Sequence, residues 1–332
     1  MLTGWHPEFT LRRELDDHER AHALEYSEEE HFSPDDAIGM IRFNSVYMEF
    51  VDRTFKVKGM LSTLVSVLGS LLLVCMFALS SAHVAGNAQL GALGKSVFIF
   101  LFGVVCLGVP WLLWRSVLRK DIFQYTHYPI RFNRKTGKIH FFRHQGLGGV
   151  VTLRWGDPSV YFHIGRGEQN GRLRDLRCHV LDGDRKVQQT LTVGHFWDHE
   201  NSVREEWELI RRYMEEGPDK CFDHPGDRVI TLSTSMTWRN CWLMVCLMAG
   251  TNLYPWRWSL LFPLYGGLTL SRWLTMKTCR KPAFPPEIEA ECSIDPGDRY
   301  RLPEPSFMAE FAEDQMIYDR SVQRFRERQQ WR

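Results

Sequence analysis

A literal His-Glu-x-x-His motif occupies residues 18–22, where His18 and His22 flank Glu19. Zinc hydrolases carry this motif on one helix: the two histidines bind the metal and the glutamate acts as general base. A third ligand would come from residues 28–31 (EEEH). The surrounding segment is polar on every side, however, whereas such helices are amphipathic and lie in a core. We therefore expect a solvated acidic helix, with a zinc hydrolase using His18, Glu19 and His22 as a remote alternative.

Four further histidines fall in a region rich in strand signals: His140, His144, His163 and His179. Cross-strand neighbours among them could form a metal-binding or titrating cluster. None of them shows the close ligand spacing of a typical zinc site. We expect surface or edge-strand residues rather than metal ligands.

A group of basic residues follows the second long apolar segment and faces a single acid in that stretch, Asp121. The group comprises Arg115, Arg119, Lys120, Arg131, Arg134, Lys135, Lys138 and Arg143. Basic residues beside a membrane attract anionic lipid, by about 1 kcal/mol each. Topology alone accounts for the first three. The other five, Arg131, Arg134, Lys135, Lys138 and Arg143, are the expected contacts for lipid headgroups or a partner protein.

Other catalytic signatures are missing from the sequence. The glycines at 146–149 and 165–167 lack the spacing of phosphate-binding loops and are explained by turns. No nucleophile elbow occurs. The 41 Lys and Arg nearly cancel the 40 Asp and Glu, giving a net charge of +1, which argues against a strongly basic nucleic-acid binder. We expect no enzyme activity, no cofactor and no nucleic-acid partner.

Two long apolar segments predict a transmembrane hairpin. Met60–Ala82 and Ser96–Ser116 each supply the roughly 20 apolar residues that a helix needs to cross a bilayer. Pro110 predicts a kink in the second segment. A buried helical hairpin of a soluble domain is the weaker alternative.

A second apolar region, Cys241–Met276, is interrupted at residues 254–258 (YPWRW). Two short spans, a re-entrant hairpin and a single long span all fit its length. The single span is disfavoured because Arg257 would lie in mid-segment. Two short spans joined by an aromatic turn at the membrane interface are the favoured interpretation.

Lys and Arg residues gather on one side of both apolar hairpins, which sets the expected orientation. They are Arg53, Lys56, Lys58, Arg115, Arg119, Lys120, Lys277, Arg280 and Lys281, whereas the first connecting loop contains only Lys95. Both termini and the central domain should therefore be cytoplasmic. No cleavable signal peptide is visible. The eight cysteines show no paired Cys-x-x-Cys spacing, in keeping with a reducing compartment.

The central region, residues 118–238, predicts an antiparallel β domain. Alternating apolar residues and turn pairs such as Asn170-Gly171 and Asp182-Gly183 indicate about six strands. A helix follows at Asn201–Glu216, whose apolar stripe includes Trp207. This order is typical of a pleckstrin-homology-like barrel closed by one helix. The expected fold class is thus an α+β membrane protein, with transmembrane helical hairpins and a cytoplasmic β domain.

We divide the chain into five segments on these grounds. The acidic N-terminal segment carries a polar helix at Glu14–Tyr26, and the C-terminal segment has a Pro-rich linker and an amphipathic helix at Pro305–Arg328. The segments are residues 1–58 (N-terminal and juxtamembrane), 59–117 (first hairpin), 118–238 (β domain), 239–276 (second hairpin) and 277–332 (linker and tail).

Several stretches of the central region carry a family resemblance: PIRFNRKTGKIHFFR, GGVVTLRWGD, YFHIGRG, DLRCHVLDGD and VGHFWDHENSVREEWELIRRYMEEGP. Over about residues 44–280 the chain resembles a family of uncharacterised proteobacterial multi-pass membrane proteins. The resemblance implies a bacterial inner-membrane location but transfers no catalytic residues. Such genes often neighbour those of type VI secretion effectors, which implies an immunity or accessory role against a cognate toxin. The alternative is a membrane-anchored scaffold that docks anionic lipid or a secretion component; the oligomeric state stays open.

Overall fold

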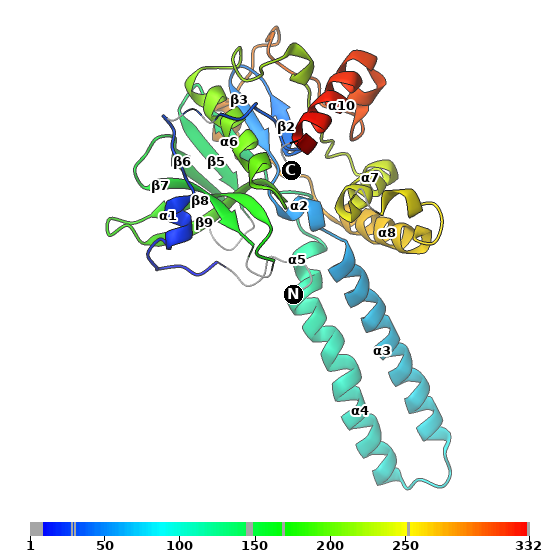
Figure 1. The fold of residues 1–332 in the computed structure, drawn as a ribbon. Helices are drawn as coiled ribbons and strands as arrows, with labels where there is room; N and C mark the ends of the chain where they lie inside the picture. Colours follow the sequence, from blue (N-terminus) through cyan, green and yellow to red (C-terminus); the bar gives the residue numbers. More distant parts are fainter. Residues whose placement is uncertain are drawn as a thin grey trace.

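The computed structural model describes residues 9–330, except 28, 30, 144–148, 168–169 and 251–252. It has an α+β body from which one long helical hairpin projects (Figure 1). His144, one of the histidines singled out above, lies outside the described residues.

The body contains two antiparallel sheets. The four-stranded sheet has the order β1 (Ala23–Leu24), β7 (Val160–Arg166), β8 (Arg174–Leu181) and β9 (Val187–Trp197). The five-stranded sheet has the order β2 (Met40–Phe43), β3 (Tyr47–Phe50), β4 (Ile130–Asn133), β5 (Lys138–Phe142) and β6 (Val150–Arg154).

The central region therefore supplies six strands, as predicted, but they form no closed barrel. The chain leaves β6 through a turn at Gly156, whose φ is +74°, and enters the other sheet at β7. No pairing joins β6 to β7 within the described chain. The first three strands come from residues 23–50, which the sequence-based division places outside the β domain.

One hydrophobic core joins the two sheets. Phe132 and Ile139 of the five-stranded sheet pack with Phe162 of the four-stranded sheet and with Trp207. Trp207 belongs to α6 (Glu200–Glu215), which packs against β4, β8 and β9. It is fully buried, as predicted, and its ring centroid lies 4.9 Å from that of Phe162.

The projecting hairpin consists of α3 (Leu61–Gly86) and α4 (Ala92–Leu113). The second helix continues through a π-helical turn (Trp114–Leu118) and α5 (Arg119–Asp121). Both helices are long and apolar enough to cross a membrane, and only 17% and 11% of their most apolar windows are buried. The helix passes through Pro110, and the π-helical turn follows within one turn of helix.

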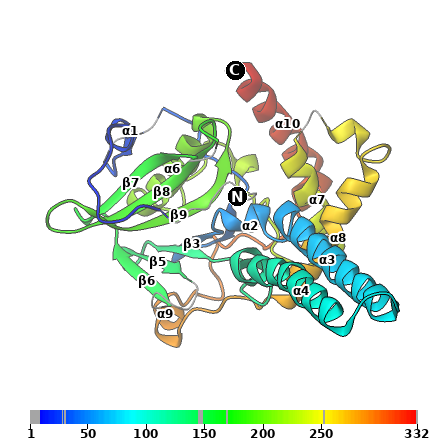
Figure 2. The ribbon, with the colours of Figure 1, turned by 90° about the horizontal axis from the view of Figure 1, so that it is seen from below.

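The second apolar region forms two shorter helices, α7 (Trp238–Ala249) and α8 (Phe262–Thr278). At 1.5 Å per residue they reach about 18 and 26 Å, less than the roughly 30 Å of a bilayer core. The favoured interpretation of two further spans is therefore not supported. Figures 1 and 2 show the pair beside the start of α3 rather than along its length.

The remaining helices are short, except the last. They are α1 (Asp17–Ala21), α2 (Thr54–Val57), α9 (Pro286–Glu291) and α10 (Gln315–Gln330). The helix expected at residues 14–26 is only five residues long, because β1 follows at Ala23. The tail helix begins ten residues later than predicted, after Ala309 adopts φ +62°.

Candidate metal centre

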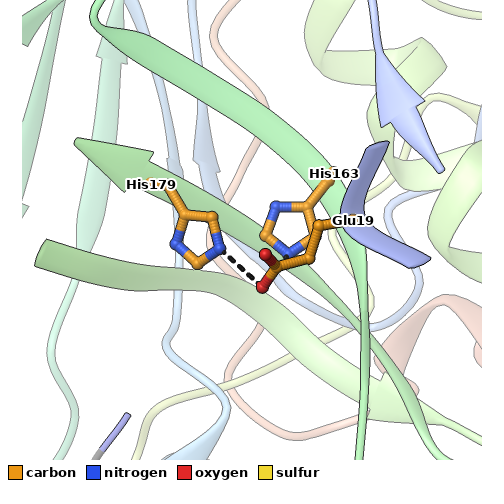
Figure 3. Close-up of side chains that lie close together, drawn as sticks. All are labelled: Glu19, His163 and His179. Carbon is orange, nitrogen blue, oxygen red and sulfur yellow. Dashed lines mark hydrogen bonds and ion pairs between the residues drawn. The ribbon is translucent and has the colours of Figure 1, made fainter. Parts of the chain in front are cut away.

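Three side chains from distant parts of the chain meet above the four-stranded sheet: Glu19, His163 and His179 (Figure 3). Glu19 comes from α1, where the side chain of Asp16 accepts from the Glu19 amide and Glu19 in turn accepts from the Asp16 amide. This capping box fixes the direction in which the short helix presents its glutamate.

The two histidines lie on neighbouring strands. His179 pairs with Tyr161 in the β7–β8 ladder, so His163 is its diagonal neighbour on the same face of the sheet. The ring centroids are 4.3 Å apart. Period-two alternation thus places both rings beneath α1.

The donor atoms converge on one carboxylate oxygen. Glu19 Oε1 lies 3.0 Å from His179 Nε2 and 3.8 Å from His163 Nε2. All three possible ligand atoms lie within 4.8 Å of one another. Glu19 is 4% exposed and both histidines are fully buried.

The surroundings satisfy Glu19 and His179 but not His163. Arg13 Nη1 donates to Glu19 Oε2 at 2.7 Å, and Arg13 Nη2 donates to Oε1. His179 Nδ1 lies 2.9 Å from Thr190 Oγ1. Neither ring nitrogen of His163 has a hydrogen-bond partner, although both are buried.

Electrostatics keep a negative carboxylate next to a neutral imidazole. Burial alone would raise the pKa of Glu19, but hydrogen bonds from Arg13 and His179 hold that pKa well below its ordinary value. Burial, with His179 alongside, lowers the pKa of His163 well below its ordinary value. An ionised carboxylate and a neutral imidazole with one free nitrogen lone pair are the donor types that Zn²⁺ binds.

The sequence motif is therefore split by the fold. Its glutamate joins the cluster, whereas His18 and His22 lie to the side with their rings 4.0 Å apart. His22 is the C-cap of α1, and its Nδ1 lies 2.9 Å from the carbonyl of His18. The helix ends at Ala21, so His22 does not continue it; Glu19 is buried against the sheet, whereas Asp17 and Arg20 are exposed.

His140 lies in the other sheet and has separate partners. Its Nε2 is 2.7 Å from Glu291 Oε1, and its Nδ1 is 3.0 Å from Thr152 Oγ1. It is buried rather than at the surface. The expectation of exposed strand histidines is thus wrong for His140, His163 and His179.

The basic residues expected at headgroups divide into two kinds. Arg131 is 1% exposed, and its guanidinium bonds to Glu49 at 2.8 Å and to Glu289 at 3.2 Å. Lys138 pairs with Glu291 at 2.7 Å, and Arg143 is half-buried. The charge of Arg131 is therefore neutralised inside the fold by Glu49 and Glu289, which indicates a structural role.

Arg134 and Lys135 are exposed in the β4–β5 turn. That turn lies at the end of β4 opposite to the segment that leads out of α5.

A family model matches residues 110–296, which is more than half of the 332-residue chain. The chain belongs to DUF6708, a family of unknown function. No curated protein and no solved structure matches significantly. The DUF6708 region contains His163 and His179 but not Glu19, so the cluster joins the family region to the N-terminal segment.

Proposed function

We propose that this protein is a non-enzymatic, membrane-anchored binding protein, with α3 and α4 in the bilayer and the body in the cytoplasm. The exposed apolar surface of the hairpin carries this proposal. Leu79 and Phe100 are 73% and 68% exposed, among many other apolar side chains of α3 and α4. A continuous apolar surface of this size is unfavourable in water and suits a hydrocarbon environment.

Charge supports a cytoplasmic body. Exposed basic residues surround the base of the hairpin: Arg115, Arg119, Lys120, Lys277, Arg280 and Lys281. The hairpin tip has only Lys95. Arg53, Lys56 and Lys58, which sequence counting includes, are buried in the body instead. The excess of positive charge at the base of the hairpin therefore rests on the six exposed residues from Arg115 to Lys281 named above.

The strand order supports an even number of crossings. β3 pairs with β4 along four residues, from Tyr47 opposite Asn133 to Phe50 opposite Ile130. The hairpin lies between these two strands in sequence, so both of its ends leave from one sheet. Both ends must then lie on the same side of the membrane.

The α7–α8 pair supports an additional contact at the membrane surface. Apolar side chains are exposed around its turn: Leu253, Trp256, Trp258, Leu260, Phe262 and Leu264. Gly267 of α8 lies beside Leu64 of α3, so this surface adjoins the first turns of the proposed span. Tryptophans at that level are typical of the interface between lipid and water.

Cysteine labelling tests the anchor and its orientation. Ala88 at the hairpin tip and Ser293 in the body are both exposed, and seven of the eight native cysteines are buried. In a Cys75→Ser background, a membrane-impermeant maleimide should label Ala88→Cys in intact cells and Ser293→Cys only after lysis. Labelling of Ser293→Cys in intact cells, or recovery of the chain in the soluble fraction, would contradict the proposal.

We propose a cognate toxin as the partner, in an immunity or accessory role for a type VI secretion effector. The support is the family resemblance and the anchor. A zinc hydrolase is disfavoured because Glu19, His163 and His179 are buried, where a substrate would not reach them.

Co-expression separates these roles. If the open reading frame next to this gene is toxic alone, the full chain should restore growth, and so should His22→Ala. Loss of protection in His22→Ala with unchanged protein level would favour a hydrolase. If the neighbour is toxic and the wild-type chain does not neutralise it, the alternative of a membrane-anchored scaffold would be favoured. The exposed basic residues at the base of the hairpin would then dock anionic lipid or a secretion component.

A further inference from the structure

The unpartnered imidazole of His163 is the feature that the proposed function leaves unused. A buried polar group without a hydrogen bond costs about 1–3 kcal/mol. Both ring nitrogens of His163 are buried and have no hydrogen-bond partner among the described residues. Figure 3 shows its ring directed at the carboxylate of Glu19, beside the ring of His179.

We propose that Glu19, His163 and His179 bind a divalent transition-metal ion, for which Zn²⁺ is best suited. A metal ion at His163 Nε2 would use the lone pair that has no other partner. The inference is independent of the membrane anchor and of any toxin.

The spacing of the donor atoms fits a small tetrahedral ion. Ligands about 2.1 Å from zinc in tetrahedral geometry are about 3.4 Å apart. The two separations from Glu19 Oε1, 3.0 Å to His179 and 3.8 Å to His163, lie on either side of that value. Shifts of a few tenths of an ångström in side chains alone would equalise them.

The neighbouring residues suit a metal-bound form. A metal at His179 Nε2 requires the tautomer with its proton on Nδ1, and Thr190 Oγ1 lies 2.9 Å from Nδ1 as an acceptor. Arg13 donates to both oxygens of Glu19, through Nη1 to Oε2 and through Nη2 to Oε1, which fixes the carboxylate while a further lone pair of Oε1 can face the ion. Tyr161 donates to the Glu19 carbonyl at 3.0 Å and fixes the backbone of α1.

The site would be structural rather than catalytic. Three protein ligands would leave the fourth position of a tetrahedral ion to a water molecule, but the ligands are 0–4% exposed, and a catalytic zinc needs an open position that substrate can reach. The ion would tie α1 to β7 and β8. Without it, the N-terminal segment is held there by the two-residue strand β1, which pairs with β7, and by a few side-chain contacts. Loss of the ion should therefore release the N-terminal segment before the sheet unfolds.

Metal analysis of the full chain, purified in detergent without chelator, tests the site. We expect about one equivalent of zinc per chain, reduced at least about tenfold in His163→Ala and in His179→Ala. His140→Ala is the matched control, since His140 is also a buried strand histidine beside a glutamate but has no third ligand. It should keep the zinc.

A second control separates this site from the sequence motif. His18→Ala/His22→Ala should also keep the zinc; loss of zinc in that double variant with retention in His163→Ala would overturn the proposal. For chains purified without metal, added Zn²⁺ should raise the melting temperature of the wild type and of His140→Ala, but not of His163→Ala. A wild-type chain that neither holds zinc nor responds to it would reduce the cluster to an ion-paired network and refute the site.

Discussion

The two sheets are each covered by a terminal segment that places glutamate against histidine, yet the two contacts differ in how fully their charges are matched. On the five-stranded sheet, Glu289 and Glu291 of α9 meet Arg131 and Lys138 at 3.2 and 2.7 Å, with His140 beside Glu291. On the four-stranded sheet, Glu19 meets Arg13 and two histidines, and one of these has no hydrogen bond.

The difference shows how an ion pair and a ligand set can be told apart. A carboxylate lies beside a histidine on both sheets, so this contact alone does not distinguish an ion pair from a set of metal ligands. What separates them is that neither ring nitrogen of His163 has a hydrogen-bond partner among the described residues, whereas Nδ1 of His140 has one in Thr152. The cations near α9 are permanent charges, whereas two of the three groups around Glu19 are imidazoles.

The largest expected effect is a loss of stability that involves both sheets. Trp207 lies in the core between the sheets, within 5.6 Å of the Trp155 ring as well as that of Phe162. Trp207→Ala should lower the free energy of unfolding by about 3–5 kcal/mol, through lost burial and a residual cavity. Denaturant unfolding of the full chain in micelles measures this change. Trp238→Ala, which removes a half-exposed tryptophan, is the control and should cost under about 1 kcal/mol.

The next effect separates the two regions. Glu19→Ala should cost about 2–4 kcal/mol, because it leaves His179 and Arg13 without their shared acceptor in a buried site. Glu289→Ala removes a carboxylate whose side chain is 49% exposed and should cost under about 1 kcal/mol. The same unfolding measurement compares them. Equal losses would mean that the two contacts are alike and that the distinction between them is wrong.

The smallest effect sharpens the comparison through pH. His127 lies near the five-stranded sheet, and its burial, with Arg42, Lys281 and Lys58 nearby, lowers its pKa to about 3. The unfolded chain binds the proton below pH about 6.5, so stability should fall as pH drops from about 6.5 toward 3.

The expected slope from His127 is up to about 1 kcal/mol per pH unit. His127→Gln should flatten the curve by that amount in pH-dependent thermal melts. His83→Gln, at the exposed end of α3, should leave the curve unchanged. An identical slope in wild type and His127→Gln would show that other groups govern the acid range.

The elements with a clear local period are the ones that the sequence predicts. Strands β4–β9 and the helix containing Trp207 show alternation or a helical stripe, and the structure contains each of them. The sequence does not predict β3, although Met48 and Phe50 face the core and alternate with Tyr47 and Glu49. A strand of four residues is too short for this alternation to be distinguished from a piece of helix.

The candidate sites depend on long-range pairing, which a single sequence does not reveal. Arg131 looks like a surface cation until Glu49 and Glu289, 82 and 158 positions away, bury it. The sequence motif includes Glu19 but gives it the wrong partners, because it assumes helical spacing where the helix is five residues long. One available signal for the cluster is the alternation along β7, which places His163 on the face opposite to the core residue Phe162.

The pairing of β3 with β4 also has a consequence for the order of folding. Phe50 and Ile130 must find each other across the whole length of α3 and α4, and closing so long a flexible loop carries a large entropic cost. Once the hairpin is inserted, its two ends are held together: the amide of Gly59 donates to Asp121 at 3.1 Å. The effective loop then shrinks to the few residues on either side. If α3 and α4 span the bilayer as proposed, the bilayer would serve as a template, and the sheet would close quickly only after the nascent chain has entered the membrane.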